Sequence, residues 1–398
     1  MLSKEMVNLG RVRSVIREMF EYGNKRAAEI GRENVFDYSL GNPSVPSPEI
    51  VNETLINLLQ NTDPVALHSY SSAPGDPNVR QSIAENLNKE YGTDFSAGNI
   101  YITSGAAAAL CITFKALAEK DDEFIAFAPF FPEYRVFVEN TGGKLSVVKC
   151  REEDFQIDFN ALKSAINEHT KAIVINSPCN PSGVVFSKET IIELSRVLKE
   201  AEIKYGHPIF LVSDEPYREL VYDNIEVPFV PNFYSNTIVC YSFSKSLSIP
   251  GERIGYILIS NKSVAADTIF EAVAGAGRAL GYVCASSMFQ KLIPVCMGKT
   301  ADISVYKKNR DLLCNALTEY GFTLPSPDGA FYLFIKALED DANKFCENAK
   351  KFELLLVPGD SFGYPGYVRI SYCVSTEQII NSLPAFKKLA DGYRNGEF

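Results

Sequence analysis

The sequence predicts an α/β protein with a mostly parallel central sheet covered by helices, together with a smaller α+β domain. From about residue 98, short apolar segments alternate with longer segments in which apolar residues recur at helical spacing. This alternation is typical of βαβ units, whose parallel strands are covered by helices on both faces. The last third of the chain differs, because it combines long helical patterns with few, short strands. A length of 398 residues, of which 46% are hydrophobic, is sufficient for two such units.

The alternating region is expected to form the large domain. Its apolar segments predict strands at residues 99–103, 123–128, 144–150, 171–176, 208–213 and 237–242. Most of the intervening segments predict helices, at 105–119, 132–141, 158–167 and 187–205. Near the C-terminus we expect a helix at 301–320 and strands at 331–335 and 367–372. We therefore expect a large domain over residues 46–285 and a small domain made of 286–398 with the N-terminal segment 1–45.

Charge and composition restrict the classes of partner. The chain has 39 Lys and Arg against 49 Asp and Glu, a formal net charge of −10, and it contains no block of five basic residues. We therefore expect neither nucleic acid nor an acidic membrane as a partner. The N-terminus carries charges throughout, and no stretch of 18 apolar residues occurs, so neither secretion nor membrane insertion is expected.

The cysteines and histidines point to a reducing compartment and to no metal site. The nine cysteines are odd in number, widely scattered and never in a CxxC pair, which is typical of reduced, buried thiols in a cytoplasmic protein. Only three histidines occur (His68, His169 and His207), and no two of them lie within one helical turn, so a metal site based on histidine is not expected.

Polar residues gather after several predicted strands, where an open parallel sheet binds its ligands. The first group is TSGAA at 103–107, between a strand and a helix. Backbone N–H groups at that helix start would bind an anion such as phosphate, and Gly105 would let the anion approach closely. The alternative is an ordinary strand-to-helix turn in which Ser104 is the N-cap.

Two further groups follow the strands at 171–176 and 208–213. NSPCNPSG at 176–183 is a rigid, proline-rich turn that would aim an Asn amide at a ligand, although turn formation alone also explains it. SDEPY at 213–217 places Asp214 at the end of a very apolar strand. A buried carboxylate there needs a cationic or hydrogen-bonding partner, unless Asp214 only caps the following turn.

The last group, SFSK at 242–245 followed by PGERIG at 250–255, is the most specific. A lysine directly after a strand, flanked by hydroxyl groups, forms a Schiff base with an aldehyde once its surroundings lower its pKa. Arg253 is placed to return to the same strand ends as a bidentate ligand for phosphate. Lys245 and Arg253 are therefore candidate residues of one site.

Together these motifs resemble a known family. SFSK and GERIG, with NSPCNPSG and DEPY upstream and PGYVRISYC downstream, are similar to the motifs of the pyridoxal-phosphate-dependent class I/II aminotransferases, of the aspartate aminotransferase fold type. The similarity extends from Ile16 to about residue 375, in the family's order and spacing. It implies the fold of pyridoxal-phosphate-dependent transferases, with the cofactor held by the large domain.

The resemblance implies roles around the cofactor ring. Lys245 matches the lysine that forms the Schiff base with pyridoxal phosphate and later moves the proton from the substrate Cα. Asp214 matches the carboxylate that pairs with the pyridine nitrogen and keeps the ring an electron sink. Asn180 and Tyr217 match donors to the phenolic oxygen, and Phe131 matches the aromatic residue that stacks on the ring.

The resemblance also implies a phosphate site shared between two subunits. The backbone of Gly105 and Ala106, the hydroxyl of Ser242 and the guanidinium of Arg253 match its ligands. Tyr70 matches a tyrosine that reaches the phosphate from the other subunit, so a homodimer with active sites at the interface is implied. The alanines at 106–109 depart from many relatives, which often have a hydroxyl or acidic side chain there.

For the substrate, the resemblance implies that Arg369 binds the α-carboxylate, with Gly41 and Asn180 beside it. Residues 14–17 and 40–43 are expected to line the entrance. Arg278 lies near the position where dicarboxylate-specific relatives carry an arginine that reaches across the dimer to the distal carboxylate. Arg17 is a weaker candidate for this task. The alternative for Arg278 is a solvent-facing arginine at a helix end.

The function implied is an amino-acid:2-oxo-acid aminotransferase, similar to aspartate or aromatic aminotransferases, which works by ping-pong transamination through pyridoxamine phosphate. A β-eliminating C–S lyase of the same fold is an alternative, because it keeps the same lysine, aspartate and arginine. A pyridoxal-phosphate-sensing regulator is a third, but about 40 residues before SLGNP leave little room for a DNA-binding region, and the charge balance is acidic. The motifs leave the amino donor and the oxo-acid acceptor open.

Overall fold

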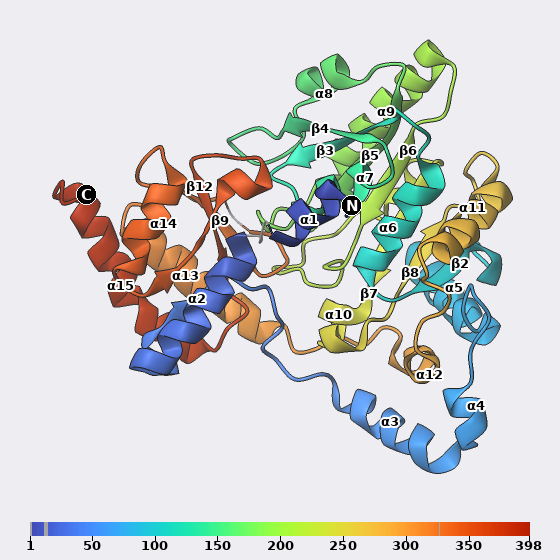
Figure 1. Ribbon diagram of the computed structural model, residues 1–398, viewed down its shortest axis with the longest axis horizontal. Helices are drawn as coiled ribbons and strands as arrows, with labels where there is room; N and C mark the ends of the chain where they lie inside the picture. Colours follow the sequence, from blue (N-terminus) through green and yellow to red (C-terminus); the bar gives the residue numbers. More distant parts are fainter. Residues whose placement is uncertain (1, 12–14, 326) are drawn as a thin grey trace.

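The structure is a computed structural model that describes residues 2–11, 15–325 and 327–398. Ser14, which belongs to the predicted entrance segment, lies outside the described residues. The helices, labelled in Figure 1, are α1 (Lys4–Arg11), α2 (Val15–Ile30), α3 (Glu49–Asn61), α4 (Pro64–His68), α5 (Pro77–Tyr91), α6 (Ala106–Leu117), α7 (Glu133–Glu139), α8 (Phe159–Ala165), α9 (Lys188–Tyr205), α10 (Phe243–Ser246), α11 (Ala266–Ala279), α12 (Ser287–Cys296), α13 (Ser304–Glu319), α14 (Ala342–Lys350) and α15 (Thr376–Arg394).

A seven-stranded sheet forms the centre of the larger part of the molecule. Its strands are β2 (Ile100–Thr103), β3 (Glu123–Ala128), β4 (Lys144–Lys149), β5 (Thr170–Asn176), β6 (Phe210–Asp214), β7 (Thr237–Ser242) and β8 (Gly255–Ile259). Their order is β2-β8-β7-β6-β5-β3-β4. The pairs from β7 through β4 are parallel, and β8 is antiparallel to both of its neighbours. The predicted α/β class with a mostly parallel sheet is therefore confirmed.

The predicted strands correspond to β2 through β7 within two residues at either end, but β8 was not predicted. The apolar segment of β8 follows the PGERIG motif at once, and the crossover from β7 contains only α10 and a single 3-10 turn. A connection so short has no long helix between the strands, and it therefore allows only an antiparallel neighbour.

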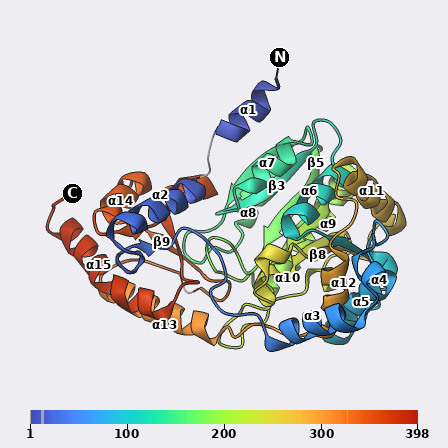
Figure 2. The ribbon, with the colours of Figure 1, turned by 60° about the horizontal axis from the view of Figure 1, so that its bottom comes forward.

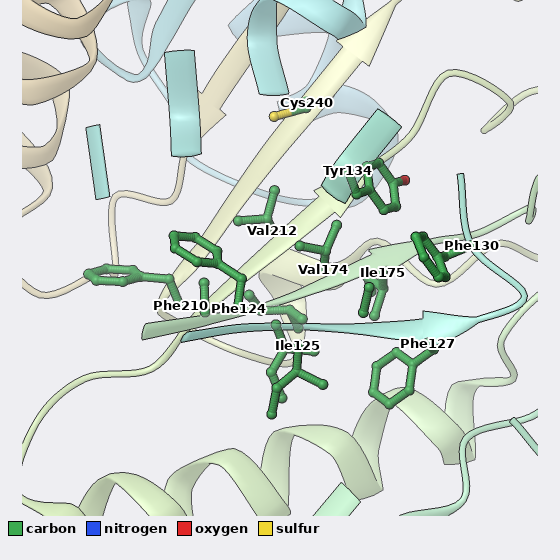
Figure 3. Packing of buried hydrophobic residues seen from close by; sticks show 14 of the residues in the cluster. Phe124, Ile125, Phe127, Phe130, Tyr134, Val174, Ile175, Phe210, Val212 and Cys240 are labelled. Carbon is green, nitrogen blue, oxygen red and sulfur yellow. The ribbon is translucent and has the colours of Figure 1, made fainter. Parts of the chain in front are cut away.

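Both faces of this sheet are covered, as alternate residues of β7 show. Ile238 and Cys240 belong to a large apolar cluster with residues of α6, α7, α9 and α11, whereas Val239 and Tyr241 belong to a second cluster with residues of α5 and α12. Figure 3 shows members of the first cluster that project from β3, β5 and β6. Successive side chains of a strand point to opposite faces, so the sheet is buried on both sides.

The second part of the molecule is built around a small antiparallel sheet of β11 (Val357–Pro358), β12 (Tyr367–Ser371) and β9 (Tyr332–Lys336), in that order. Helices α13, α14 and α15 pack against it through a separate apolar cluster (Figure 1). The N-terminal segment joins this part, because β1 (Phe36–Asp37) pairs in parallel with β10 (Leu354–Leu355), and the carbonyl of Tyr38 accepts the N–H of Ser371 at 3.0 Å.

Helix α12 lies with the central sheet. Phe289, Leu292, Ile293 and Cys296 join the apolar cluster on the α5 side of that sheet, and α12 contacts α3 and α5. The sequence-based boundary at 285/286 separates this helix from the elements on which it packs. We propose that the large domain continues through α12, to about residue 300.

Helix α1 projects from the body of the molecule in Figure 2. None of its residues, all of them described, is buried. In residues 2–11, 15–325 and 327–398 the structure has no helix that is both long and apolar enough to cross a bilayer.

Candidate active site

A cavity of about 290 Å³ opens at the carboxyl ends of β5, β6 and β7. Parallel sheets bind ligands at this edge, because their loops and helix starts converge there. The cavity brings together most of the residues that the sequence singled out: Gly41, Ala106, Phe131, Asn180, Asp214, Tyr217, Ser242, Lys245, Arg253 and Arg369. A larger recess of about 630 Å³ lies elsewhere, between Arg151 and Glu193, and contains none of them.

Lys245 is positioned by the short helix α10, which starts directly after β7. Ser242 caps this helix by accepting the N–H of Ser244 at 3.2 Å, and the Nζ of Lys245 donates to the carbonyl of Gly41 at 2.7 Å. Burial lowers the pKa of Lys245 from 10.5 to about 8; the nearby thiol of Cys373 opposes this shift and the charges of Arg253 and Arg369 add to it. The amine is therefore a nucleophile at mildly alkaline pH.

Asp214 ends β6 inside the cavity wall, and its carboxylate has one open position. Tyr134 donates to Oδ2 at 2.6 Å, and the Asn176 amide donates to the main-chain carbonyl at 2.8 Å. Oδ1 is buried and has no hydrogen-bond partner among the described residues. Burial raises the pKa of Asp214 to about 7, against the lowering effect of the Tyr134 hydrogen bond. A cationic N–H group at Oδ1 would satisfy this oxygen and restore the charged carboxylate.

The start of α6 and Arg253 form a cradle for an anion. Gly105 precedes this helix with φ +86°, and a Cβ atom at that position would lie 2.5 Å from the Nη2 of Arg253. Arg253 itself has φ +53° and donates from Nη1 to the Ser244 hydroxyl at 3.3 Å and to the Pro250 carbonyl at 3.0 Å. The positive φ favours glycine here, and the guanidinium lies directly beside the helix start, so N–H groups and a cation face the same space.

Arg369 lies in the middle of β12 and reaches the cavity from the small sheet. It is 2% exposed, donates from Nη1 to the Asn180 side chain at 3.1 Å and from Nη2 to the Ser39 carbonyl. Its Nε, buried as well, has no hydrogen-bond partner in the described ranges. The rings of Tyr332 and Phe362 lie 4.8 and 5.0 Å from the guanidinium carbon. A buried guanidinium with a free N–H is suited to bind a carboxylate.

Three predicted residues lie away from the cavity of this chain. Tyr70, shortly after α4, is 94% exposed. Arg278 lies in the last turn of α11 on the surface, and it does not line the cavity. Within one chain, Arg278 therefore matches the solvent-facing alternative. Any contribution of Tyr70 or Arg278 to a neighbouring subunit's site stays a prediction. Arg17 is also exposed and outside the lining, whereas its neighbour Ile16 lines the cavity as expected.

Several site residues were not predicted. Tyr134 holds Asp214, Asn176 holds both Asp214 and the N–H of Asn180, and the Tyr332 and Tyr217 hydroxyls lie 2.9 Å apart. One signal was available for Tyr134, because it lies three residues after Phe131, just inside the start of α7.

Comparison with known proteins identifies the same family as the sequence motifs. Residues 33–385 match the family described as aminotransferase class I and II. Aspartate aminotransferase of Thermotoga maritima is 30% identical over 88% of this chain and 90% of its own length. A crystal structure of an amino transferase from Eubacterium rectale has a TM-score of 0.97 and 56% identity, and covers 99% of both chains. Aspartate aminotransferase of Thermus thermophilus, in a structure with maleate, has a TM-score of 0.84 and 26% identity, covering 98% of this chain and 99% of that one.

Proposed function

Because the chain belongs to the class I and II aminotransferases, whose members use pyridoxal phosphate, we propose that it transfers amino groups between amino acids and 2-oxo acids at the Lys245 cavity. The reaction is a ping-pong exchange, in which the donor leaves as a 2-oxo acid before the acceptor binds. Relatives named aspartate or aspartate/prephenate aminotransferase support this reaction class.

The residues of the cavity fit pyridoxal phosphate. The N–H groups at the start of α6, Ser242 and Arg253 would hold the phosphate, where Gly105 keeps the approach open. Lys245 would form the covalent bond to the aldehyde carbon. Oδ1 of Asp214, which has no partner in the described part of the chain, would accept the ring N–H. Bound pyridoxal phosphate supplies an electron sink for the charge that develops at the substrate Cα.

Around that group, the chain's own residues would bind substrate and move one proton. Arg369 binds the α-carboxylate through its guanidinium, and Asn180 fixes the orientation of that arginine. Nζ of Lys245, free once the amino acid has taken its place, would be the base that removes the Cα proton. With a pKa of about 8, roughly half of the free amine is neutral at pH 8. Tyr217, whose hydroxyl lies 2.9 Å from that of Tyr332, would donate a hydrogen bond to the phenolic oxygen of the cofactor. Phe131 and Leu110 are apolar residues of the same lining.

The observation that carries the proposal is the meeting of three groups from distant segments in one cavity: a lysine with a lowered pKa, a buried carboxylate with an open oxygen and a buried arginine with an open N–H.

We further propose that the chain acts as a homodimer with Tyr70 at the partner's site. We propose a cytoplasmic location, on the ground that the nine cysteines are odd in number and widely scattered along the sequence.

A single-turnover experiment tests the function. The protein loaded with pyridoxal phosphate is mixed with single amino acids in the absence of any oxo acid, and the released 2-oxo acid is counted by mass spectrometry. An aminotransferase releases one oxo acid per site and then stops until an acceptor is added. Continuous release of pyruvate and ammonia from a cysteine conjugate would identify the C–S lyase instead. No release from any amino acid would contradict both activities.

A further inference from the structure

The main chain of residues 39–41 spans the two groups that would hold the substrate. The Ser39 carbonyl accepts from Arg369, and the Gly41 carbonyl accepts from Nζ of Lys245 at 2.7 Å. Between them, the Leu40 carbonyl accepts from the Ser371 hydroxyl at 3.1 Å. Leu40 is therefore held between the site of the α-carboxylate and the site where the Cα proton is removed.

The side chain of Leu40 lines the cavity and is 42% exposed, although a leucine in a well-held segment gains stability by burial. Ile16, near the start of α2, lines the same cavity and is half-buried. Ala107 and Leu110, from α6, extend this apolar lining. A ligand that bonds to Lys245 and Arg369 therefore meets an apolar wall beside its Cα.

The cations in the lining have other tasks. Among the described residues the cavity contains Lys245, Arg253 and Arg369 as its cationic side chains. If the proposed function holds, on which this inference rests, these three serve the covalent bond, the phosphate and the α-carboxylate. A second carboxylate on the substrate would then be desolvated without a cationic partner from this chain, which is costly, whereas an apolar side chain gains from the same contact.

We propose that Leu40 and Ile16 form the subsite for the substrate side chain, and that this subsite takes a neutral, apolar side chain of aliphatic or aromatic type rather than a second carboxylate. Such a subsite distinguishes apolar from charged ligands, because burial of an apolar side chain favours binding and desolvation of a carboxylate opposes it. The expected preference is at least roughly tenfold in affinity.

Unreactive carboxylates test the preference without catalysis. The protein loaded with pyridoxal phosphate is titrated in a calorimeter with 4-methylpentanoate and 3-phenylpropionate, and in parallel with succinate and maleate. All four present a carboxylate to Arg369, so only the rest of the molecule differs. We expect the two apolar acids to bind at least roughly tenfold more tightly than the two dicarboxylates.

Variants of Leu40 test whether the apolar residues of the cavity cause this preference for apolar acids. Leu40→Arg is expected to reverse the order by adding a cation beside the substrate Cα. Leu40→Ala is expected to weaken 4-methylpentanoate by several-fold and to leave succinate unchanged. Ile203→Arg, at a position that is 84% exposed on α9 and outside the cavity, is the matched control and should change neither affinity.

The inference is overturned if wild-type protein binds succinate or maleate as tightly as the apolar acids or more tightly. In that case Arg278→Leu shows whether the second subunit supplies the cation, since only then does that variant lose dicarboxylate affinity. An absence of binding for all four acids, with no oxo acid released from any amino acid, is the separate result that contradicts the proposed function itself.

Discussion

Tyr134 donates its hydroxyl proton to Oδ2 of Asp214 at 2.6 Å, while Oδ1 of the same carboxylate is buried without a partner among the described residues. The two oxygens therefore differ in role. One is held by the protein, and the other has no hydrogen-bond partner in the described part of the chain. Tyr134 is positioned for this by α7, and its ring centroid lies 5.7 Å from that of Phe131 and 6.4 Å from that of Phe130. Figure 3 shows Tyr134 and Phe130 in this part of the core.

Tyr134→Phe should slow the half-reaction with an amino donor by roughly 10- to 150-fold, the equivalent of losing one hydrogen bond to a charged group, about 1.5–3 kcal/mol. The ring packing stays, but the hydrogen bond that lowers the pKa of Asp214 is lost. Stopped-flow absorbance of the bound cofactor gives the rate. Tyr364→Phe removes a 3.3 Å hydrogen bond to the Cys150 carbonyl outside the cavity, and it should leave the rate unchanged. Equal rates in Tyr134→Phe and wild type would remove this role.

The raised pKa of Asp214 predicts how the stability of the cofactor-free protein depends on pH. Because the folded carboxyl has a pKa of about 7, against an ordinary value of 3.8, the folded state binds more protons than the unfolded state between these values. Cofactor-free wild type should therefore lose stability as pH rises from about 4 to 7.

Asp214→Asn has no such proton, so its stability relative to wild type should increase across this range, by up to about 4 kcal/mol for a shift of roughly three pK units. Urea unfolding of both cofactor-free proteins at pH 5 and pH 8 covers about two of these units, so it should show a change of roughly 3 kcal/mol. The account of Asp214 is wrong if the difference between the two proteins is the same at both pH values.

Covalent attachment of pyridoxal phosphate should follow the titration of Lys245. With a pKa of about 8, the neutral amine increases from roughly a tenth of the population at pH 7 to roughly nine tenths at pH 9. The rate of attachment to cofactor-free protein should rise accordingly and level off above pH 9. An ordinary lysine would keep gaining about tenfold per pH unit up to pH 10. A rate that still rises in that way above pH 9 would exclude the lowered pKa.

A mixed dimer tests whether Tyr70 acts across the subunit interface. One subunit carries Lys245→Ala and the other carries Tyr70→Ala, and differently tagged chains allow the mixed dimer to be purified. If Tyr70 serves the partner's site, one site of this dimer has both native residues, and it should keep roughly half of the wild-type activity at native cofactor affinity. If Tyr70 serves its own chain, neither site is intact. Activity no higher than that of the two parent variants would then contradict the shared site.

The sequence was sufficient to predict β2 through β7, because buried parallel strands are short, nearly continuous apolar segments between helices. Strand β8 was not predicted, because it is antiparallel to its neighbours and follows β7 after only α10 and a 3-10 turn. The cluster that joins α12 to β7 and β8 was not predictable either, because no local pattern shows on which sheet a helix packs.

The site was predicted where a motif follows a strand. Asp214 is the last residue of β6, and Lys245 comes shortly after the end of β7. These two strands are neighbours in the sheet and their carboxyl ends lie side by side, so the two residues are expected to meet. Tyr134 and Tyr332 contact the site through packing between elements that are far apart in the chain, and spacing carries no information about such pairs. Arg278 was singled out by its distance from Lys245 in the sequence alone. That distance does not determine on which side of α11 the residue lies, and the structure places it on the surface.

The most direct test of the account is to locate the cofactor on the chain. Protein incubated with pyridoxal phosphate is reduced with borohydride, digested and mapped by mass spectrometry, with Lys245→Ala in parallel. We predict one reduced cofactor per chain, attached to Lys245. We also predict that Lys245→Ala still binds the cofactor, but without a covalent bond, so that dialysis removes it. Label spread over surface lysines to the same extent in both proteins would contradict the assignment of this cavity as the active site.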